Sequence, residues 1–383
     1  MIDEKAWISV RGRHRHTGYD MKIAFLNDTV SWYHWGCTGT SMGIRSQLEE
    51  FDCDVTFIPV HSTYGFKPVP RSLTDFDDLE FFRQTIHSNG PVFDQLASAD
   101  LVMVNGEGTI HHLTQPSVIL LYIAYVTRKY LNKPVQIINH SPYPVANPQL
   151  QELTNHIYAG VYKTLDFAGI REHISQSHMG KLGIQSTLTF DCLPLSLEGE
   201  GLLLPKHEKE NYIVISNSVS FPRERVEDLV GVLKALSKTG LEPVILTGAK
   251  SHPALDEQNF LAWLDEYRNE LSWRIVSPDN LVAWYRYIAG ARLLISGRFH
   301  HSIAAYFQNT PFVLMASNTP KNVALSETLM TDKPIDYSDE KFAESLLGSA
   351  LEKLDTAYSS DQDLVFNLIE RAKLNFSKAR KLL

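Results

Sequence analysis

The sequence predicts an α/β protein with two Rossmann-like domains that face each other across a cleft. Short apolar runs, typical of buried strands, alternate with segments whose apolar residues recur every three or four positions, as in amphipathic helices. The alternation is interrupted once, by a stretch rich in glycine, proline and charge, and then resumes. The chain has 383 residues, which suits two domains of about 150 residues each, with further helices after them.

This interruption sets the expected domain boundaries. We expect a flexible N-terminal extension over 1–20, a first domain over 21–195, a linker over 196–210, a second domain over 211–338 and C-terminal helices over 339–383. The extension is basic but lacks the apolar run of a signal peptide, and terminal segments are usually loosely held. The composition of the C-terminal helices leaves open whether they brace the first domain or form a dimer.

The expected strands fall into two sets. The first comprises 22–26, 54–60, 99–105, 135–139, 166–170 and 187–190, and the second comprises 212–216, 243–247, 273–276, 293–295 and 312–315. Parallel α/β sheets bind their ligands outside the carboxyl ends of the strands. We therefore look for functional residues directly after the strands.

Composition and charge exclude several classes of protein. The net charge of -8 provides no basic field that would attract nucleic acid. The three cysteines, Cys37, Cys53 and Cys192, form no CxxC pair, which argues against a zinc or disulfide framework and favours a reducing compartment. No stretch reaches the roughly 20 apolar residues needed to span a bilayer. We expect a cytoplasmic protein.

The strongest candidate site lies in the stretch LLISGRFHHSIAAYFQNTP. Its apolar run ends at Ser296 and Gly297, and a segment of helical spacing follows Arg298. A guanidinium at a helix start, beside free backbone N–H groups, is a good receptor for phosphate or carboxylate. We expect His300 to face the turn more readily than His301, because His300 and the arginine flank an apolar residue. Alternatively, the arginine only pairs locally and the histidines are surface residues.

A second candidate follows the strand at 99–105. There a single carboxylate, Glu107, lies between Gly106 and Gly108. The glycines allow a sharp turn and the close approach of a substrate, and Glu107 would be a suitable general base for a hydroxyl. The alternative is that Glu107 caps the next helix, although Thr109 is the better cap by residue type.

Further polar residues follow other strands of the first set. His140 comes after the strand at 135–139, and Arg171 follows the strand at 166–170, with Ser175 on the helix after it. Arg171 repeats the pattern of Arg298. We therefore expect both arginines at the same edge.

The loop after the first strand is aromatic and rich in glycine. Its sequence, SWYHWGCTGTSMG, does not have the GxGxxG spacing, so we reject a dinucleotide site. Its aromatic residues either stack on a sugar ring or pack the domain interface, and Thr38 or Thr40 is expected to cap the helix that follows. The candidate binding residues in this region are Asn27, Trp35, Gly36 and Thr38.

These motifs together resemble the polysaccharide pyruvyl transferase family. The resemblance rests on GEG after a strand, REHIS followed by LGI and an aspartate, and SGRFHHSIAAYFQNTP followed by Lys321, and it covers about 21–330. It implies a glycosyltransferase-B-like fold. It also implies a transferase that moves pyruvyl from phosphoenolpyruvate to a sugar hydroxyl as a ketal, in the biosynthesis of surface polysaccharides.

The resemblance suggests Arg171, Arg298 and His300 as donor-site residues. Two arginines from different domains can clamp the phosphate and carboxylate of phosphoenolpyruvate, while His300 or His140 supplies a proton and Glu107 accepts one. The other expected donor residues are Ser175, Ser296, Gly297, His301 and Lys321. The expected acceptor residues are Asn27, Trp35, Gly36, Thr38, Gly106, Gly108 and Thr109.

No cofactor is expected beyond phosphoenolpyruvate as donor substrate, and no ligand set for a metal is apparent. The expected partner is a sugar or lipid-linked oligosaccharide acceptor. Peripheral contact with the inner membrane surface and a homo-oligomer remain open.

One departure from the family concerns Glu107. Members commonly have three glycines where this chain has Gly106-Glu107-Gly108, and a carboxylate is unfavourable beside a trianionic donor. Either Glu107 faces the acceptor, or the protein is a glycosyltransferase with a nucleotide-sugar donor. A non-catalytic glycan- or nucleotide-binding protein of the same fold is the third hypothesis.

Overall fold

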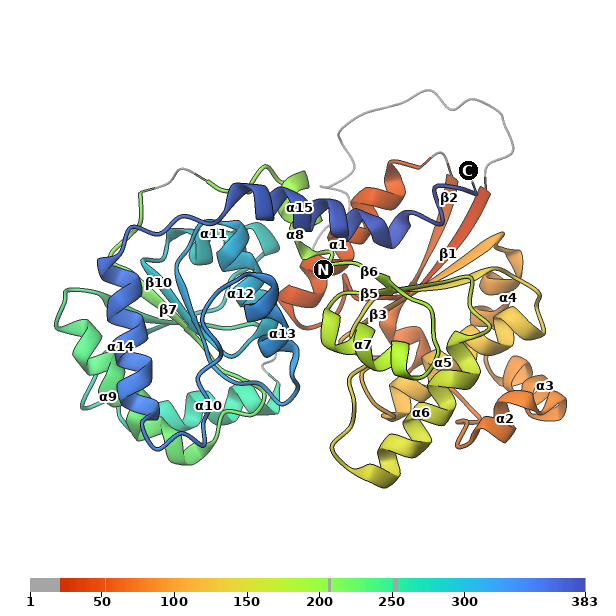
Figure 1. The fold of residues 1–383 in the computed structure, drawn as a ribbon, viewed down its shortest axis with the longest axis horizontal. Coiled ribbons are helices and arrows are strands. Elements are labelled where there is room, and N and C mark those ends of the chain that lie inside the picture. The colour runs from red at the N-terminus through yellow and green to blue at the C-terminus, as the bar shows by residue number, and fades with distance from the viewer. Residues whose placement is uncertain (1–20, 52, 206–207, 251–253, 383) are drawn as a thin grey trace.

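The fold is described from a computed structural model, which covers residues 21–51, 53–205, 208–250 and 254–382 (Figure 1). The expected N-terminal extension over 1–20 lies outside these described residues. The chain forms two parallel sheets with helices on their faces, which confirms the predicted fold class.

The first sheet has the strand order β2-β1-β3-β4-β5-β6, with all neighbours parallel. Every residue of β3 and β4 is buried, as expected for a parallel sheet covered on both faces. We call this sheet and its helices the first half. Its strands are β1 (Met21–Asp28), β2 (Cys53–Pro59), β3 (Leu101–Glu107), β4 (Val135–His140), β5 (Phe167–Ile170) and β6 (Thr187–Leu188). Its helices are α1 (Trp35–Glu49), η2 (Val60–Thr63), α2 (Leu73–Asp77), α3 (Leu79–Ser88), α4 (Gly90–Ser98), α5 (Gln115–Lys129), α6 (Pro148–Tyr162), α7 (His173–Lys181) and α8 (Leu193–Gly199).

The second half is built around a sheet with the order β11-β10-β7-β8-β9, again parallel throughout. Its strands are β7 (Tyr212–Ser216), β8 (Glu242–Leu246), β9 (Arg274–Val276), β10 (Leu293–Ser296) and β11 (Phe312–Leu314). Its helices are η3 (Arg223–Arg225), α9 (Val226–Ser237), α10 (Leu255–Asp265), α11 (Leu281–Gly290), α12 (Phe299–Phe307) and α13 (Lys321–Thr328). All the expected strands are present in the two sheets, shifted by two residues or fewer at most ends.

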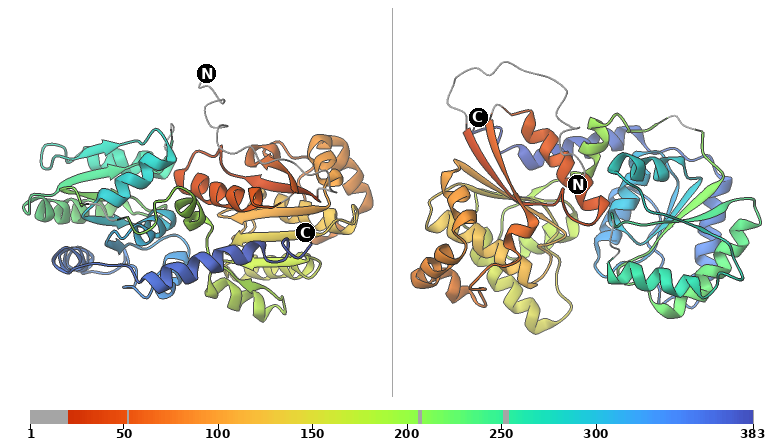
Figure 2. Two further views of the ribbon diagram at one scale, coloured as in Figure 1. Left: turned by 90° about the horizontal axis from the view of Figure 1, so that it is seen from above. Right: turned by 180° about the vertical axis from the view of Figure 1, so that it is seen from behind.

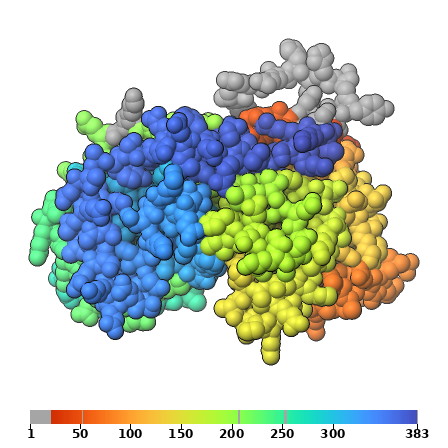
Figure 3. Space-filling model, viewed as in Figure 1, coloured from red at the N-terminus to blue at the C-terminus, as the bar shows by residue number. Residues whose placement is uncertain are grey.

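The C-terminal helices connect the two halves. Helix α14 (Phe342–Asp355) packs beside α9, whereas α15 (Gln362–Lys373) and η4 (Leu374–Phe376) run back over the first half (Figures 1 and 2). In η4, Asn375 accepts a hydrogen bond from the N–H of Asn139 at 3.0 Å and donates one to the carbonyl of Phe190 at 3.0 Å. The tail therefore braces the first half. The space-filling view shows α15 crossing from one half to the other (Figure 3).

Helix α8 joins the halves from the inside. Residues 196–199 were expected to belong to a linker, but they form the end of this helix, with Leu195 and Leu197 buried. Gly43 of α1 packs so closely on α8 that a Cβ there would lie 2.1 Å from the carbonyl oxygen of Cys192. One apolar core runs from β1 and β3 through α8 to β7, β10 and α12. The expectation of a linker failed at 196–199 because the glycines and charges that follow α8 masked its buried leucines.

The loop before α1 is also tied to the second half. The backbone N–H of Trp35 donates to the carbonyl of Gly248 at 2.8 Å, and His34 forms an antiparallel bridge with Ala249. The N-cap of α1 is His34, so the expected cap at Thr38 or Thr40 is wrong. Within the described part of the chain, no helix is both long enough and apolar enough to cross a bilayer.

Candidate active site

Three adjoining cavities lie where the carboxyl ends of the two sheets meet, and Glu107 and Gly108 line all of them. The first, of about 210 Å³, is bordered by both halves and is lined by Arg171, Arg298, His300 and Lys321 among others. The second, of about 180 Å³, extends it toward Ser141, Tyr143 and Thr319. The third, of about 300 Å³, lies in the first half and has aromatic walls. We call the first the cationic cavity and the third the aromatic cavity.

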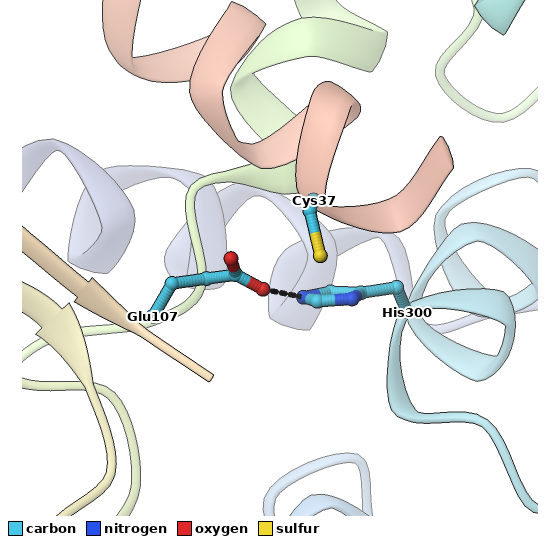
Figure 4. A group of neighbouring side chains, drawn as sticks. All are labelled: Cys37, Glu107 and His300. Carbon is cyan, nitrogen blue, oxygen red and sulfur yellow. Dashed lines mark ion pairs between the residues drawn. The ribbon is translucent and has the colours of Figure 1, made fainter. Parts of the chain in front are cut away.

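Glu107 lies at the junction of these cavities. It is the last residue of β3 and only 3% exposed, and its Oε1 is 3.5 Å from His300 Nε2 (Figure 4). The Cys37 thiol forms a hydrogen bond with the same carboxylate. The next helix, α5, starts eight residues later and is capped by Thr114, so Glu107 is not a helix cap.

His300 reaches from α12 into the first half. Its Nε2 lies 3.5 Å from Asp191 Oδ2 and 3.4 Å from Thr40 Oγ1. Gly36 permits this approach, because a Cβ at Gly36 would lie 2.5 Å from the His300 ring nitrogen Nδ1. The side chain that the sequence placed at the turn therefore meets groups of the opposite half.

Arg171 is buried, and most of its guanidinium is used by neighbours in the first half. It forms an ion pair with Asp191 at 2.6 Å, and its Nε donates to Ser141 Oγ at 2.9 Å. Its guanidinium also lies over the ring of Phe299, 4.8 Å from the centroid. Burial alone would raise the pKa of the Asp191 carboxyl, but His300 and Arg171 outweigh that effect and hold this pKa well below its usual range.

Arg298 is the N-cap of α12 and is less deeply buried. It forms an ion pair with Asp256, and its Nε donates to Asn217 Oδ1 at 2.9 Å. Helix α12 places the N–H groups of its first turn beside the cationic cavity, where they have no helical acceptor.

Lys321 is the cation with the fewest partners. It begins α13, and within the described residues its ammonium forms no hydrogen bond or ion pair. Burial, together with Arg171 and Arg298, lowers the pKa of Lys321 to about 8. An anion in the cavity would relieve this repulsion. The site thus combines the cations Arg171, Arg298 and Lys321 with a carboxylate–imidazole pair.

Comparison with family models identifies the chain. The model described as polysaccharide pyruvyl transferase matches residues 41–319, most of the sequence. The protein belongs to the polysaccharide pyruvyl transferase family. As a member of that family it is a transferase. A comparison with curated proteins gave no match.

Solved structures similar to this pyruvyl transferase family member share its fold. The UDP-GlcNAc 2-epimerase of Neisseria meningitidis, bound to UDP-GlcNAc, aligns with a TM-score of 0.59 at 14% identity, over 94% of this chain and 100% of that one. The Methanocaldococcus jannaschii UDP-GlcNAc 2-epimerase, in complex with UDP-GlcNAc and UDP, has a TM-score of 0.58 at 12% identity, over 94% and 99%. A UDP-forming α,α-trehalose-phosphate synthase from Burkholderia vietnamiensis has a TM-score of 0.53 at 13% identity, over 93% and 96%. These likenesses support the glycosyltransferase-B-like fold.

The structure removes His140 from the candidate catalytic residues of this transferase. His140 is fully buried and lines none of the three cavities. Its Nδ1 lies 2.9 Å from the carbonyl of Gly169, so Nδ1 must donate, and its Nε2 lies 2.7 Å from the hydroxyl of Tyr162. Burial lowers the pKa of His140 to about 3. The expected role was wrong because both ring nitrogens are used inside the fold.

Other expected binding residues are also structural. Ser175 and Ser296 are buried away from the three cavities, and Ser296 Oγ accepts a hydrogen bond from the N–H of Arg298. Thr38 bonds to carbonyls of its own loop. Trp35 packs under the Lys250 ammonium at the contact between the halves. Of the two roles expected for the aromatic residues of this loop, sugar stacking and interface packing, Trp35 therefore has the second.

Two expected acceptor glycines likewise serve packing. A Cβ at Gly106 would lie 2.4 Å from that of His140, and Gly36 accommodates the His300 ring. The expected residues that do border the cavities are Asn27, Glu107, Gly108, Thr109, Arg171, Gly297, Arg298, His300, His301 and Lys321.

The structure adds residues that the sequence reasoning did not assign to the site. Trp32, Tyr33 and Tyr64 line the aromatic cavity, with the Trp32 and Tyr64 ring centroids 5.7 Å apart. Trp32 and Tyr33 belong to the aromatic loop SWYHWGCTGTSMG, for which sugar stacking was one of two expected roles, whereas no sequence pattern pointed to Tyr64. Cys37, Asp191, Asn217 and Asp256 were not assigned either, although Asp191 directly follows an expected strand.

Proposed function

We propose that this family member transfers pyruvyl from phosphoenolpyruvate to a sugar, forming a cyclic ketal and releasing phosphate. One observation carries the proposal: the Glu107–His300 pair lies at the junction of a cationic cavity and an aromatic cavity. The first suits a small dianionic or trianionic donor, and the second suits a sugar.

The donor would be bound from the second half. Lys321 and Arg298, with the N–H groups at the start of α12, can receive a phosphate and a carboxylate. Arg171 then acts as a fixed positive boundary, since Asp191 and Ser141 already occupy much of its guanidinium. A cavity of about 210 Å³ is small, which favours phosphoenolpyruvate over a nucleotide sugar.

The chemistry requires two additions to one carbon. An acceptor hydroxyl oxygen bonds to C2 of phosphoenolpyruvate while the methylene carbon gains a proton and becomes a methyl group. A second hydroxyl of the same sugar then bonds to C2, the C2–O bond to phosphate breaks, and phosphate leaves with that bond's electron pair. The first hydroxyl proton balances the proton added to carbon, and the second leaves with phosphate.

Glu107 and His300 can handle these protons. Glu107 borders both cavities, so it can accept the hydroxyl proton, while His300 faces the cationic cavity and can deliver one to the methylene carbon. Their separation of 3.5 Å lets one group restore the protonation state of the other. This arrangement also accounts for a carboxylate where related chains commonly have glycine.

The acceptor would lie in the aromatic cavity. Trp32 and Tyr64 offer ring faces for a pyranose, and Asn27 and Thr109 offer hydrogen-bonding groups beside Glu107. We propose a surface-polysaccharide precursor, free or lipid-linked, as the acceptor, and the cytoplasm as the compartment of the reaction.

The test is donor binding followed by product analysis. Phosphoenolpyruvate, but not UDP-sugars, should raise the melting temperature of the full-length protein. With a panel of glycosides, phosphate release should accompany a new ketal methyl signal in the proton NMR spectrum of the sugar. Stabilisation by nucleotide sugars alone would refute the proposal.

A glycosyltransferase with a nucleotide-sugar donor is the second candidate. The UDP-GlcNAc-bound epimerases of similar fold favour it, as does the carboxylate at Glu107. A third, non-catalytic function would be favoured if Arg298→Ala and Glu107→Gln left ligand affinity and every biological effect intact.

A further inference from the structure

The Cys37–Glu107–His300 cluster has a property that the transfer reaction does not use. One ligand atom from each residue, a sulfur, a carboxylate oxygen and an imidazole nitrogen, lies within 4.8 Å of the other two. The three side chains converge from α1, the end of β3 and α12 (Figure 4). Such an S, O, N set is typical of protein sites for Zn²⁺.

The cluster has the form of an open metal site. Its three ligands leave a fourth position for water, and all three residues line the cationic cavity. Because sulfur is a soft ligand, the set favours Zn²⁺ and related ions over Mg²⁺ or Ca²⁺, which prefer oxygen. The carboxylate of Asp191, 3.5 Å from His300 Nε2, is a second anionic group beside the site.

The local charges are compatible with a dication. Arg171 is balanced by Asp191 in a direct ion pair. The Glu107 carboxylate remains, and a bound ion would displace the Cys37 proton to solvent and add a thiolate. These two negative charges balance the ion, while Lys321, which lines the same cavity, opposes it.

We propose that Cys37, Glu107 and His300 bind a thiophilic divalent cation such as Zn²⁺. The bound ion occupies the lone pairs of Glu107 and His300, so it inhibits turnover reversibly. Only this inhibitory consequence rests on the proposed function. Binding itself does not.

The binding test uses Co²⁺ as a spectroscopic probe. Metal-free full-length protein titrated with Co²⁺ should develop a saturable thiolate-to-cobalt absorption band in the near ultraviolet, and Zn²⁺ should abolish it. The chain has 15 histidines that can bind metal elsewhere, but only a cysteine ligand produces this band. An excess of Mg²⁺ should leave it unchanged.

The variants isolate the ligands. Cys37→Ser should remove the band and Cys53→Ser, the matched control, should keep it, with folding of each checked by circular dichroism. Cys37→Ala replaces the serine variant if that does not fold. Since the loss of even an outer partner of a metal ligand weakens binding 10- to 100-fold, His300→Gln should weaken Co²⁺ binding at least about 100-fold.

The outcomes separate the two proposals. Absence of the band in the wild-type protein, or its survival in Cys37→Ser, overturns the metal site. If the band behaves as expected but no pyruvyl transfer is detected with any acceptor, the metal site stands and the proposed function fails. If transfer occurs, Zn²⁺ should suppress it and a chelator should restore it. Transfer unaffected by saturating Zn²⁺ refutes inhibition.

Discussion

One arginine from each half lines the cationic cavity, each is paired with an aspartate of its own half, and the two pairs differ in burial. The side chains of Arg171 and Asp191 are 3% and 0% exposed, whereas those of Arg298 and Asp256 are 11% and 23% exposed. Ser141 and the Phe299 ring complete the surroundings of Arg171. Among the described residues, one terminal nitrogen of Arg298, Nη1, has no hydrogen-bond acceptor. Arginines with the same sequence context therefore differ: the first is held on all sides by the fold, and we propose that the second binds the donor.

Removing Asp191, the buried partner of Arg171, should cause the largest loss of stability. Asp191→Asn leaves the buried Arg171 guanidinium without its ion-pair partner, so we expect the free energy of unfolding to fall by about 3–5 kcal/mol. Urea denaturation of the purified variant measures this loss. A loss below about 1 kcal/mol would show that the pair is no more important than a surface ion pair.

Removing the second arginine should affect catalysis more than stability. Arg298→Ala would delete one proposed charge-assisted contact to the donor, worth about 1.5–3 kcal/mol, so kcat/KM for phosphoenolpyruvate should fall roughly 10- to 100-fold. The melting temperature should change little. A large loss of stability with normal kinetics would instead assign Arg298 a local pairing role.

Lys321, the third cation that lines the cavity, should make kcat/KM for the donor depend on pH. Because the pKa of Lys321 is lowered to about 8, its ammonium is charged below that pH and becomes neutral above it. We expect kcat/KM for the donor to fall about tenfold per pH unit above pH 8. Lys321→Arg should retain activity to higher pH. A profile flat to pH 10 would exclude Lys321 from donor binding.

The smallest loss of stability is expected from removing Asp256, the partner of Arg298 in the second half. Asp256→Asn removes an ion pair that is partly open to solvent, so the free energy of unfolding should fall by less than about 1 kcal/mol. Urea denaturation beside Asp191→Asn gives a direct comparison. Equal losses in the two variants would contradict the distinction between the pairs.

The central strands were predictable because they are short apolar runs, and β3, β4, β7 and β10 are buried along their whole length. Residues directly after parallel strands gather at one edge of the sheet, and this rule located Glu107, Arg171 and Arg298. It could not distinguish His140, which also follows a strand but is held inside by Tyr162. Strand order does not reveal which way a terminal side chain points.

The partners of the site were not predictable. Asp256 lies at the start of α10, 42 residues from Arg298, and no local pattern connects them. Cys37 meets Glu107 and His300 only because Gly36 and Gly43 allow α1 to approach the second half and α8. Such meetings depend on how helices pack, which periodicity within a single segment does not specify.

The apolar core shared by both sheets has a consequence for dividing the molecule. Domains that meet through a polar interface can be produced as independent fragments, but here the leucines of α8 contribute to a core that includes strands of both halves. A chain cut between α8 and β7 would expose apolar surface on each fragment. Activity should return only when the two fragments are expressed together and assemble, as in a split-enzyme reporter.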